Sequence, residues 1–277
     1  MLIQRVITAL VLLAILLPAL FASNPMWFAL LTLVMIAAAG WEWSRLNGRP
    51  GAAAIGFGAA LAALCACTFY LVGFSVPAWC WWLAGGLWVL GGVRALAAGV
   101  AGWPKISPAL RLALGAVLLW AAWLALIAAR ARGINFLLSA MCLVWMADIA
   151  AYFAGKAFGR RKLAPAISPG KSWEGAIGGL VGVIVLGVVW VHVIDVRVPV
   201  DSASLYSVLV RRIGVVSVLA VVFLSAMSVV GDLFESLVKR AAGAKDSSQL
   251  LPGHGGVLDR VDALLPVLPL ALALTSL

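Results

Sequence analysis

Apolar runs of about 20 residues, separated by short polar stretches, make up most of this chain. A helix of that length spans about 30 Å, which is the thickness of the hydrocarbon core of a bilayer. Charged residues make up only 11% of the sequence, against roughly 25% in an ordinary soluble domain. Since few charges remain to cover a soluble surface, we predict an all-α, polytopic integral membrane protein with eight or nine transmembrane helices.

The apolar runs give the expected spans and a division of the chain into two regions. We expect residues 1–130 to form N-terminal transmembrane helices and residues 131–277 to form a C-terminal transmembrane catalytic region. The last run has only 15 residues, or about 22 Å of helix, so it starts earlier, tilts or fails to span. The expected helices lie at about 6–22, 26–43, 52–73, 77–93, 112–129, 134–158, 175–194, 213–242 and 263–277.

Tryptophans are concentrated in the fourth run. Trp79, Trp81, Trp82 and Trp88 all fall between residues 77 and 93. Tryptophan is enriched where a span meets the lipid–water interface. We therefore expect the tryptophans of this chain to act as interfacial anchors.

The basic residues predict the orientation. The net charge is +10, but the Lys and Arg residues are scattered over loops, which argues against a nucleic-acid partner. With the N-terminus inside, fifteen of the 20 Lys and Arg residues fall on the cytoplasmic side, as the positive-inside rule requires. We therefore expect the polar segments described next to face the cytoplasm.

Two polar segments contain seven of the ten acidic residues, and acids near hydrocarbon are candidates for function. The first polar segment comprises residues 148–174 and the second comprises residues 232–262. Of the three other acids, Glu42 stands alone at a helix end, and Asp195 and Asp201 fall in an outer loop. At the start of the second segment, helical spacing places five polar residues on one stripe: Asp232, Glu235, Ser236, Lys239 and Arg240.

This charge pattern has two interpretations. One is a structural ion-pair network that closes a helix bundle at the membrane face. The other is a divalent metal held by carboxylates and substrate phosphates, with Lys and Arg neutralising the remaining charge. Two turns favour the second: the glycine-rich residues 251–256, beside Asp259 and Asp262, and residues 168–172, just before a helix start. Neither turn has the spacing of a P-loop.

Both polar segments resemble phosphatidate cytidylyltransferases, also called CDP-diacylglycerol synthases. The second matches that family's signature at every specified position, and the first is similar to it, with Ser172 where threonine is common. The resemblance covers about the C-terminal half of the chain, while residues 1 to about 130 match only as apolar spans. The matching stretches are Asp148-x-x-Ala151-Tyr152-Phe153-x-Gly155, Lys162-Leu163-x-Pro165-x-Ile167-Ser168-Pro169-x-Lys171-Ser172-x-Glu174-Gly175, Ser236-x-Val238-Lys239-Arg240, Lys245-Asp246-x-Ser248 and Leu251-Pro252-x-His254-Gly255-Gly256-Val257-x-Asp259-Arg260-Val261-Asp262.

The resemblance implies transfer of the cytidylyl group of CTP to phosphatidic acid in the bilayer, giving CDP-diacylglycerol and pyrophosphate. It implies a bacterial cytoplasmic (inner) membrane, with Mg²⁺, and a monovalent ion such as K⁺ beside it, at Asp232 and Asp259. Asp246 and Asp262 are second choices as ligands. The remaining expected site residues bind the triphosphate or complete the pocket: Lys239, Arg240, Lys245, Arg260, His254, Asp148, Tyr152, Ser168, Lys171, Ser172, Ser236, Gly255 and Gly256.

Two other functions are weighed against this one. A CTP-dependent polyprenol or lipid kinase would transfer the γ-phosphate instead, but the His254-to-Asp262 stretch fits the cytidylyltransferase better. An ion-coupled transporter would have charged residues near the centres of its spans. Apart from Asp148, the spans here contain almost no charged residues. The sequence leaves a homodimer open.

Overall fold

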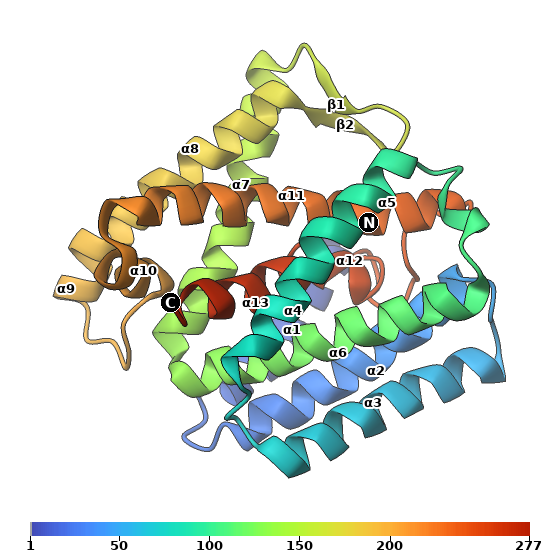
Figure 1. Ribbon diagram of the computed structural model, residues 1–277, viewed down its shortest axis with the longest axis horizontal. Helices are drawn as coiled ribbons and strands as arrows, with labels where there is room; N and C mark the ends of the chain where they lie inside the picture. The colour runs from blue at the N-terminus through green and yellow to red at the C-terminus, as the bar shows by residue number, and fades with distance from the viewer. Residues whose placement is uncertain (1) are drawn as a thin grey trace.

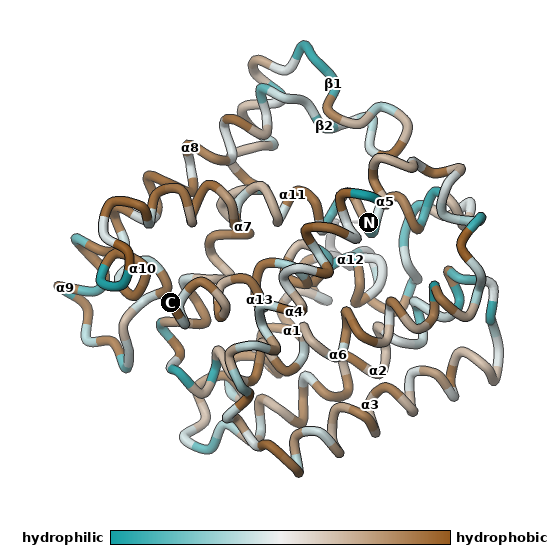
Figure 2. The backbone as a smooth tube through the Cα atoms, viewed as in Figure 1, coloured by the Kyte–Doolittle hydropathy of each residue, from teal (hydrophilic) through white to brown (hydrophobic). Residues whose placement is uncertain are grey.

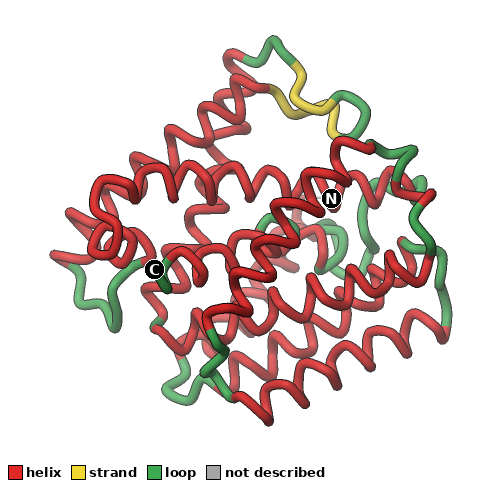
Figure 3. Tube along the Cα trace, in the orientation of Figure 1, coloured by secondary structure: helices red, strands yellow, loops and turns green. Residues whose placement is uncertain are grey.

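The computed structural model describes residues 2–277, with side chains from residue 6 onward, as a bundle of helices with one small hairpin (Figures 1 and 3). Seven of the described helical segments are long and apolar enough to cross a membrane. This confirms the predicted all-α membrane architecture, while the count of eight or nine spans stays a prediction. The elements are α1 (Leu2–Phe21), α2 (Met26–Leu46), α3 (Ala52–Val72), α4 (Ala78–Leu87), α5 (Val93–Ala98), α6 (Pro108–Arg132), α7 (Ile134–Phe158), β1 (Lys162–Ala164), β2 (Ser168–Ser172), α8 (Trp173–Val189), α9 (Asp195–Arg197), α10 (Leu205–Ile213), α11 (Ser217–Ala241), α12 (Leu258–Val261) and α13 (Leu264–Leu274).

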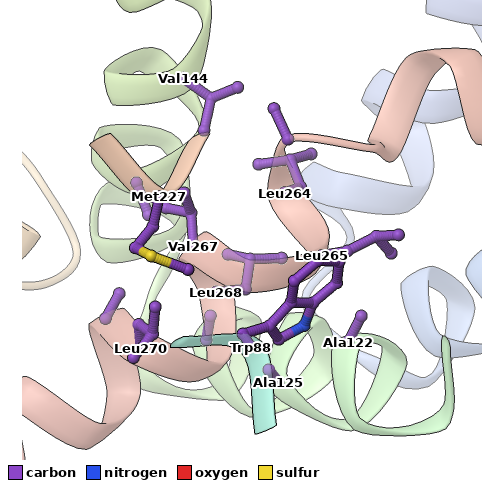
Figure 4. Close-up of a cluster of buried hydrophobic side chains, with 14 of the residues drawn as sticks. Trp88, Ala122, Ala125, Val144, Met227, Leu264, Leu265, Val267, Leu268 and Leu270 are labelled. Atoms are coloured by element: carbon purple, nitrogen blue, oxygen red, sulfur yellow. The ribbon is translucent and has the colours of Figure 1, made fainter. Parts of the chain in front are cut away.

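Helix α13 lies at the centre of the bundle, packed against α4, α6, α7 and α11 (Figure 4). Its eleven residues rise about 16 Å, which is too short to cross the hydrocarbon of a bilayer. Every residue from Leu264 to Ala273 is buried, so the helix faces protein rather than lipid. Of the alternatives that the sequence left open for the last run, the structure therefore shows a short internal helix.

Small residues bring α7 and α8 close together, as Figure 1 shows for their paired course. A side chain added at Gly179 would lie 2.6 Å from the backbone oxygen of Ala147, and one at Gly182 would lie 2.7 Å from the Cβ of Ala150. Because glycine leaves this space to the neighbouring backbone, the two helices pack tightly without a polar bond.

An aromatic cluster joins the two regions of the chain. Phe234 of α11 packs against Trp43, Trp88 and Trp103, with ring centroids 5.3–6.1 Å apart. Trp81, Trp88 and Trp103 are each at most 3% exposed. Only part of the expectation for the tryptophans is therefore right: Trp79 and Trp82 are exposed, whereas these buried indoles fill the core.

The first polar segment differs from its prediction. Residues 168–172, expected to form a turn, are strand β2, which pairs antiparallel with β1. This hairpin projects beyond the helices (Figure 1), and polar residues lie where the chain passes from α7 into β1 (Figure 2). The chain passes from Ser172 directly into α8, and the Ser172 hydroxyl caps that helix by accepting a bond from the Gly175 amide (3.1 Å).

At the opposite end of α7, Asp201 caps the helix from a separate loop. Its carboxylate accepts bonds from the amides of Ile134 (2.6 Å) and Asn135 (3.0 Å). Burial opposes ionisation, but these amide bonds outweigh it and hold the pKa of Asp201 below its usual value. The cap therefore stabilises the fold above the unfolded pKa, and its contribution is lost as the pH falls through the folded pKa.

We predict that Asp201→Asn lowers the melting temperature in detergent at pH 7 by about 2–4 °C, because asparagine keeps only one acceptor oxygen for the two amides and loses the charge, a cost of about 1 kcal/mol. The difference from the wild type should shrink as the pH falls from about 4 through the lower folded pKa, because the wild-type carboxylate is progressively protonated over that range. Equal melting temperatures at pH 7 would contradict this role.

Candidate functional site

The two polar segments meet in the structure. Lys171 of β2 forms an ion pair with Asp232 of α11, and the Arg240 guanidinium donates to the backbone oxygen of Ile167 (3.3 Å). Residues more than 60 positions apart in the sequence therefore form one polar region, as we expected if both segments face the same side.

A cavity of about 470 Å³ opens where α7, β2, α8 and α11 converge. Carboxylates reach it from α7 and α11, and a lysine and two hydroxyls reach it from β2. Its walls are otherwise small residues such as Ala147, Gly175 and Gly179. The predicted site residues that line it are Asp148, Tyr152, Ser168, Lys171, Ser172 and Asp232.

Two turns along α11 from Asp232, Lys239 joins this helix to the segment before α13. Its ammonium forms an ion pair with Glu235 one turn earlier and a second with Asp259, at 2.5 Å. The side chain of Glu235 is only 2% exposed and that of Lys239 only 12%. Helical spacing predicted that Glu235 and Lys239 share a stripe, and their pairing confirms it.

Asp259 uses both of its oxygens within the protein. Oδ1 accepts from Lys239, while Oδ2 accepts from the Ser247 amide (2.9 Å), the Ser247 hydroxyl (2.8 Å) and the Gly256 amide (2.7 Å). Burial by itself would raise the pKa of this carboxyl, but the bonds from Lys239, Gly256 and Ser247 hold it below the usual value. Asp259 is therefore ionised at neutral pH and organises the turn around itself.

Two of the three glycines of the turn, Gly255 and Gly256, are required by this arrangement. Gly255 has φ +82°, and a side chain there would lie 2.7 Å from the Asp259 carboxylate. A side chain at Gly256 would run into Ser247 and Glu42. The amide of Gly256 therefore binds one of the protein's own carboxylates, whereas we had expected the turn to present its amides to a phosphate.

Glu42 is the residue that sequence reasoning missed. It was expected to stand alone, yet its carboxylate is fully buried and accepts four bonds from the second polar segment. A lone acid at the end of an apolar helix was the only signal in the sequence, and its partners lie more than 200 residues away.

The other predicted residues lie around these clusters. Ser236 donates to Asp232 (3.2 Å), and the Arg260 guanidinium donates to the backbone oxygen of His254 (2.9 Å). The Nδ1 atom of His254 is buried and has no hydrogen-bond partner among the described residues. Lys245, Asp246, Arg240 and Arg260 are exposed at this end of the protein.

Asp262 brings a further carboxyl close to the cavity. Its burial raises the pKa to about 7, and the negative charges of Asp232 and Asp148 contribute to the increase. Carboxylates that repel one another in this way are stabilised by a bound cation. Among the described residues, however, no group of three or more acidic, His or Cys side chains is already arranged to hold a metal.

Comparison with known proteins shows where this chain belongs. Residues 3–277 match the model of the Cytidylyltransferase family. The chain belongs to this family. The likeness therefore covers nearly the whole chain, not only the C-terminal half as the two motifs suggested.

Three relatives share the name phosphatidate cytidylyltransferase. The phosphatidate cytidylyltransferase of Pseudomonas aeruginosa is 38% identical over 99% of this chain and 97% of its own length. That of Haemophilus influenzae is 48% identical over 50% of this chain and 44% of its own, and that of Bacillus subtilis is 39% identical over 52% and 49%. The first of these aligns from end to end, so the N-terminal helices also belong to the similarity.

We predict that Lys239→Met destabilises this cytidylyltransferase strongly, by about 3–5 kcal/mol, because it leaves Glu235 and Asp259 buried without their cation. Adding Glu235→Gln should restore part of that stability, because it removes one of the two unpaired charges. Melting temperatures of the single and double variants in detergent measure both effects. A double variant no more stable than Lys239→Met would argue against a shared charge cluster.

Proposed function

We propose that this chain is a phosphatidate cytidylyltransferase, which transfers the cytidylyl group of CTP to phosphatidic acid. The observation that carries the proposal is the junction of the two polar segments at one cavity, where Lys171 meets Asp232. The names of the relatives support the same activity, above all the Pseudomonas aeruginosa protein that aligns from end to end.

The reaction joins two phosphates. A phosphate oxygen of phosphatidic acid attacks the α-phosphorus of CTP, the bond from that phosphorus to the bridging β-oxygen breaks, and pyrophosphate leaves. Because the attacking oxygen is already anionic, no strong general base is required. The protein must position two anions and neutralise their charge, and those two effects dominate phosphoryl-type transfers.

Lysine and arginine residues supply the positive charge that neutralises these anions. Lys171 lines the cavity, and Lys239, which is not part of the lining, shares its charge between Glu235 and Asp259. We assign Lys171 to phosphate binding. The exposed cations Arg240, Lys245 and Arg260 would then bind the outer phosphates of CTP and the departing pyrophosphate.

The residues of the cavity fit Mg²⁺. Asp148 and Asp232 line it from two helices, and carboxylates together with substrate phosphates are the usual ligands of this ion. When bound, Mg²⁺ would neutralise the phosphates and orient them for transfer. Asp259, the second predicted ligand, already accepts three bonds on Oδ2, and its Oδ1 lies against the Lys239 ammonium, whose charge opposes a cation there. The proposal of K⁺ beside it rests on family resemblance alone.

A lipid substrate and a nucleotide substrate also restrict the setting. Seven long apolar helices make this an integral membrane protein, and CTP is a cytoplasmic metabolite. We therefore propose that the cavity opens to the cytoplasm from the bacterial inner membrane. Whether the enzyme forms a homodimer stays a prediction.

Labelled CTP tests the reaction. We expect purified protein, given phosphatidic acid and Mg²⁺, to move the label of α-labelled CTP into the lipid and to release the label of γ-labelled CTP as pyrophosphate. The α-label follows the cytidylyl group and the γ-label follows the pyrophosphate, so the two experiments together identify which bond breaks. Transfer of the γ-label to lipid would instead indicate a kinase and overturn the proposal.

We predict that Asp259→Asn lowers the turnover rate at least about 100-fold, a loss typical of removing a group that organises charge in a site. Asparagine keeps the size of the side chain but cannot accept from Lys239 and Ser247 on both sides. Asp201→Asn is the matched control, because it makes the same change at the far end of α7. Wild-type turnover in folded Asp259→Asn would remove this residue from the site.

A further inference from the structure

We propose that Glu42, in the N-terminal region, is a positioning residue that holds residues 247–258 in place and thereby sets the affinity for CTP. This segment includes the glycine-rich residues 251–256, and the whole of it is called the turn below. This inference rests on the proposed cytidylyltransferase activity. It assigns a part in that activity to a helix outside both signature segments.

The contacts of Glu42 are all directed to the turn. Its carboxylate accepts from the hydroxyls of Ser247 (3.2 Å) and Ser248 (2.6 Å). It also accepts from the amides of Val257 (2.9 Å) and Leu258 (2.8 Å). One side chain therefore ties both ends of the turn to α2.

The burial of Glu42 makes these bonds necessary. Its exposed fraction is 0%, and an isolated buried carboxylate costs several kcal/mol. Three donors, and the Ser247 hydroxyl that Glu42 shares with Asp259, offset that cost. In return, the carboxylate binds the first amides of α12, a helix of only four residues that is too short to be stable without outside support.

Glu42 and Asp259 act on the same small group of residues. The Ser247 hydroxyl lies 3.2 Å from Glu42 and 2.8 Å from Asp259, although it has only one proton to donate. A side chain on Gly256 would meet both Ser247 and Glu42, so glycine is needed for the two carboxylates to approach the turn together. A shift of Glu42 would therefore displace the segment that holds Asp259.

Helix α2 is itself fixed to α11. Trp43, next to Glu42, stacks on Phe234 with ring centroids 6.1 Å apart, and its indole donates to the backbone oxygen of Arg111 (3.0 Å). Asp232 and Lys239 extend from the same helix as Phe234. Glu42 thus aligns the turn with the residues of α11 through a rigid aromatic contact.

The expected effect falls on CTP rather than on the lipid. The turn contains His254 and leads into Asp259, the second predicted metal ligand, and into Arg260, which we assign to the phosphates of CTP. The cavity walls formed by α7 and α8 receive no contact from Glu42. Loss of Glu42 should therefore raise the KM for CTP while leaving the KM for phosphatidic acid nearly unchanged.

Three variants in detergent or nanodiscs test the inference. Glu42→Gln places an amide N–H against the donors of the turn, and we expect the KM for CTP to rise about tenfold, with the KM for phosphatidic acid within about twofold. Ser248→Ala, which removes one donor and leaves the buried charge, should raise the KM for CTP about threefold. Hydrogen exchange of residues 247–258 should be faster in both variants.

Thr32→Val is the matched control, because it removes a buried hydroxyl from the same helix whose bonds go to Phe28 and Trp123. It should leave the KM for CTP unchanged even where the melting temperature falls. An unchanged KM for CTP in Ser248→Ala and in folded Glu42→Gln, or an equal rise in Thr32→Val, would overturn the role of Glu42. Absence of any CTP-dependent turnover in the wild type would contradict the proposed function instead. Hydrogen exchange would in that case still test whether Glu42 stabilises the turn.

Discussion

The ammonium of Lys239 holds two parts of the site together, and much of the arrangement depends on it. It lies between Glu235 of its own helix and Asp259 of the following segment, with little access to solvent. Two carboxylates in such surroundings would repel each other, so neither position is tenable without the cation. The pairing fixes the turn against α11, and with it every residue that Asp259 binds.

The buried acids and the open acids have different surroundings. Glu42 and Asp259 accept several bonds each from the protein, and these bonds shape the backbone near the site. Asp148 and Asp232 instead line a cavity, where a substrate or an ion has access to them. The hydrogen-bonded acids therefore hold the backbone around the site in place, while the acids of the cavity stay accessible to a ligand. A site that positions its ligand requires both kinds.

How far the sequence predicted this molecule depends on the range of each interaction. Helix spacing within α11 predicted the stripe that contains Glu235 and Lys239, because i and i+4 residues always share a face. The two motifs also predicted that Lys171 and Asp232 belong to one site. Glu42 escaped because its partners come together only when α2 packs against the segment that leads into α12, which no local pattern encodes. The burial of Trp88 and Trp103 was missed for the same reason, since an indole fits both an interface and a core.

The pair formed by Lys171 and Asp232 also explains how a charged site can exist beside hydrocarbon. Without substrate, the lysine and the carboxylate neutralise each other, so neither bears an unpaired charge near the apolar part of the membrane. If a nucleotide binds here with a metal ion, as we propose, it would supply a new partner to each of them: a phosphate for Lys171 and a cation for Asp232. The ion pair would then exchange partners without creating an uncompensated charge. On that proposal the pair would favour a metal-bound triphosphate over a free one, because a free triphosphate offers no cation to Asp232.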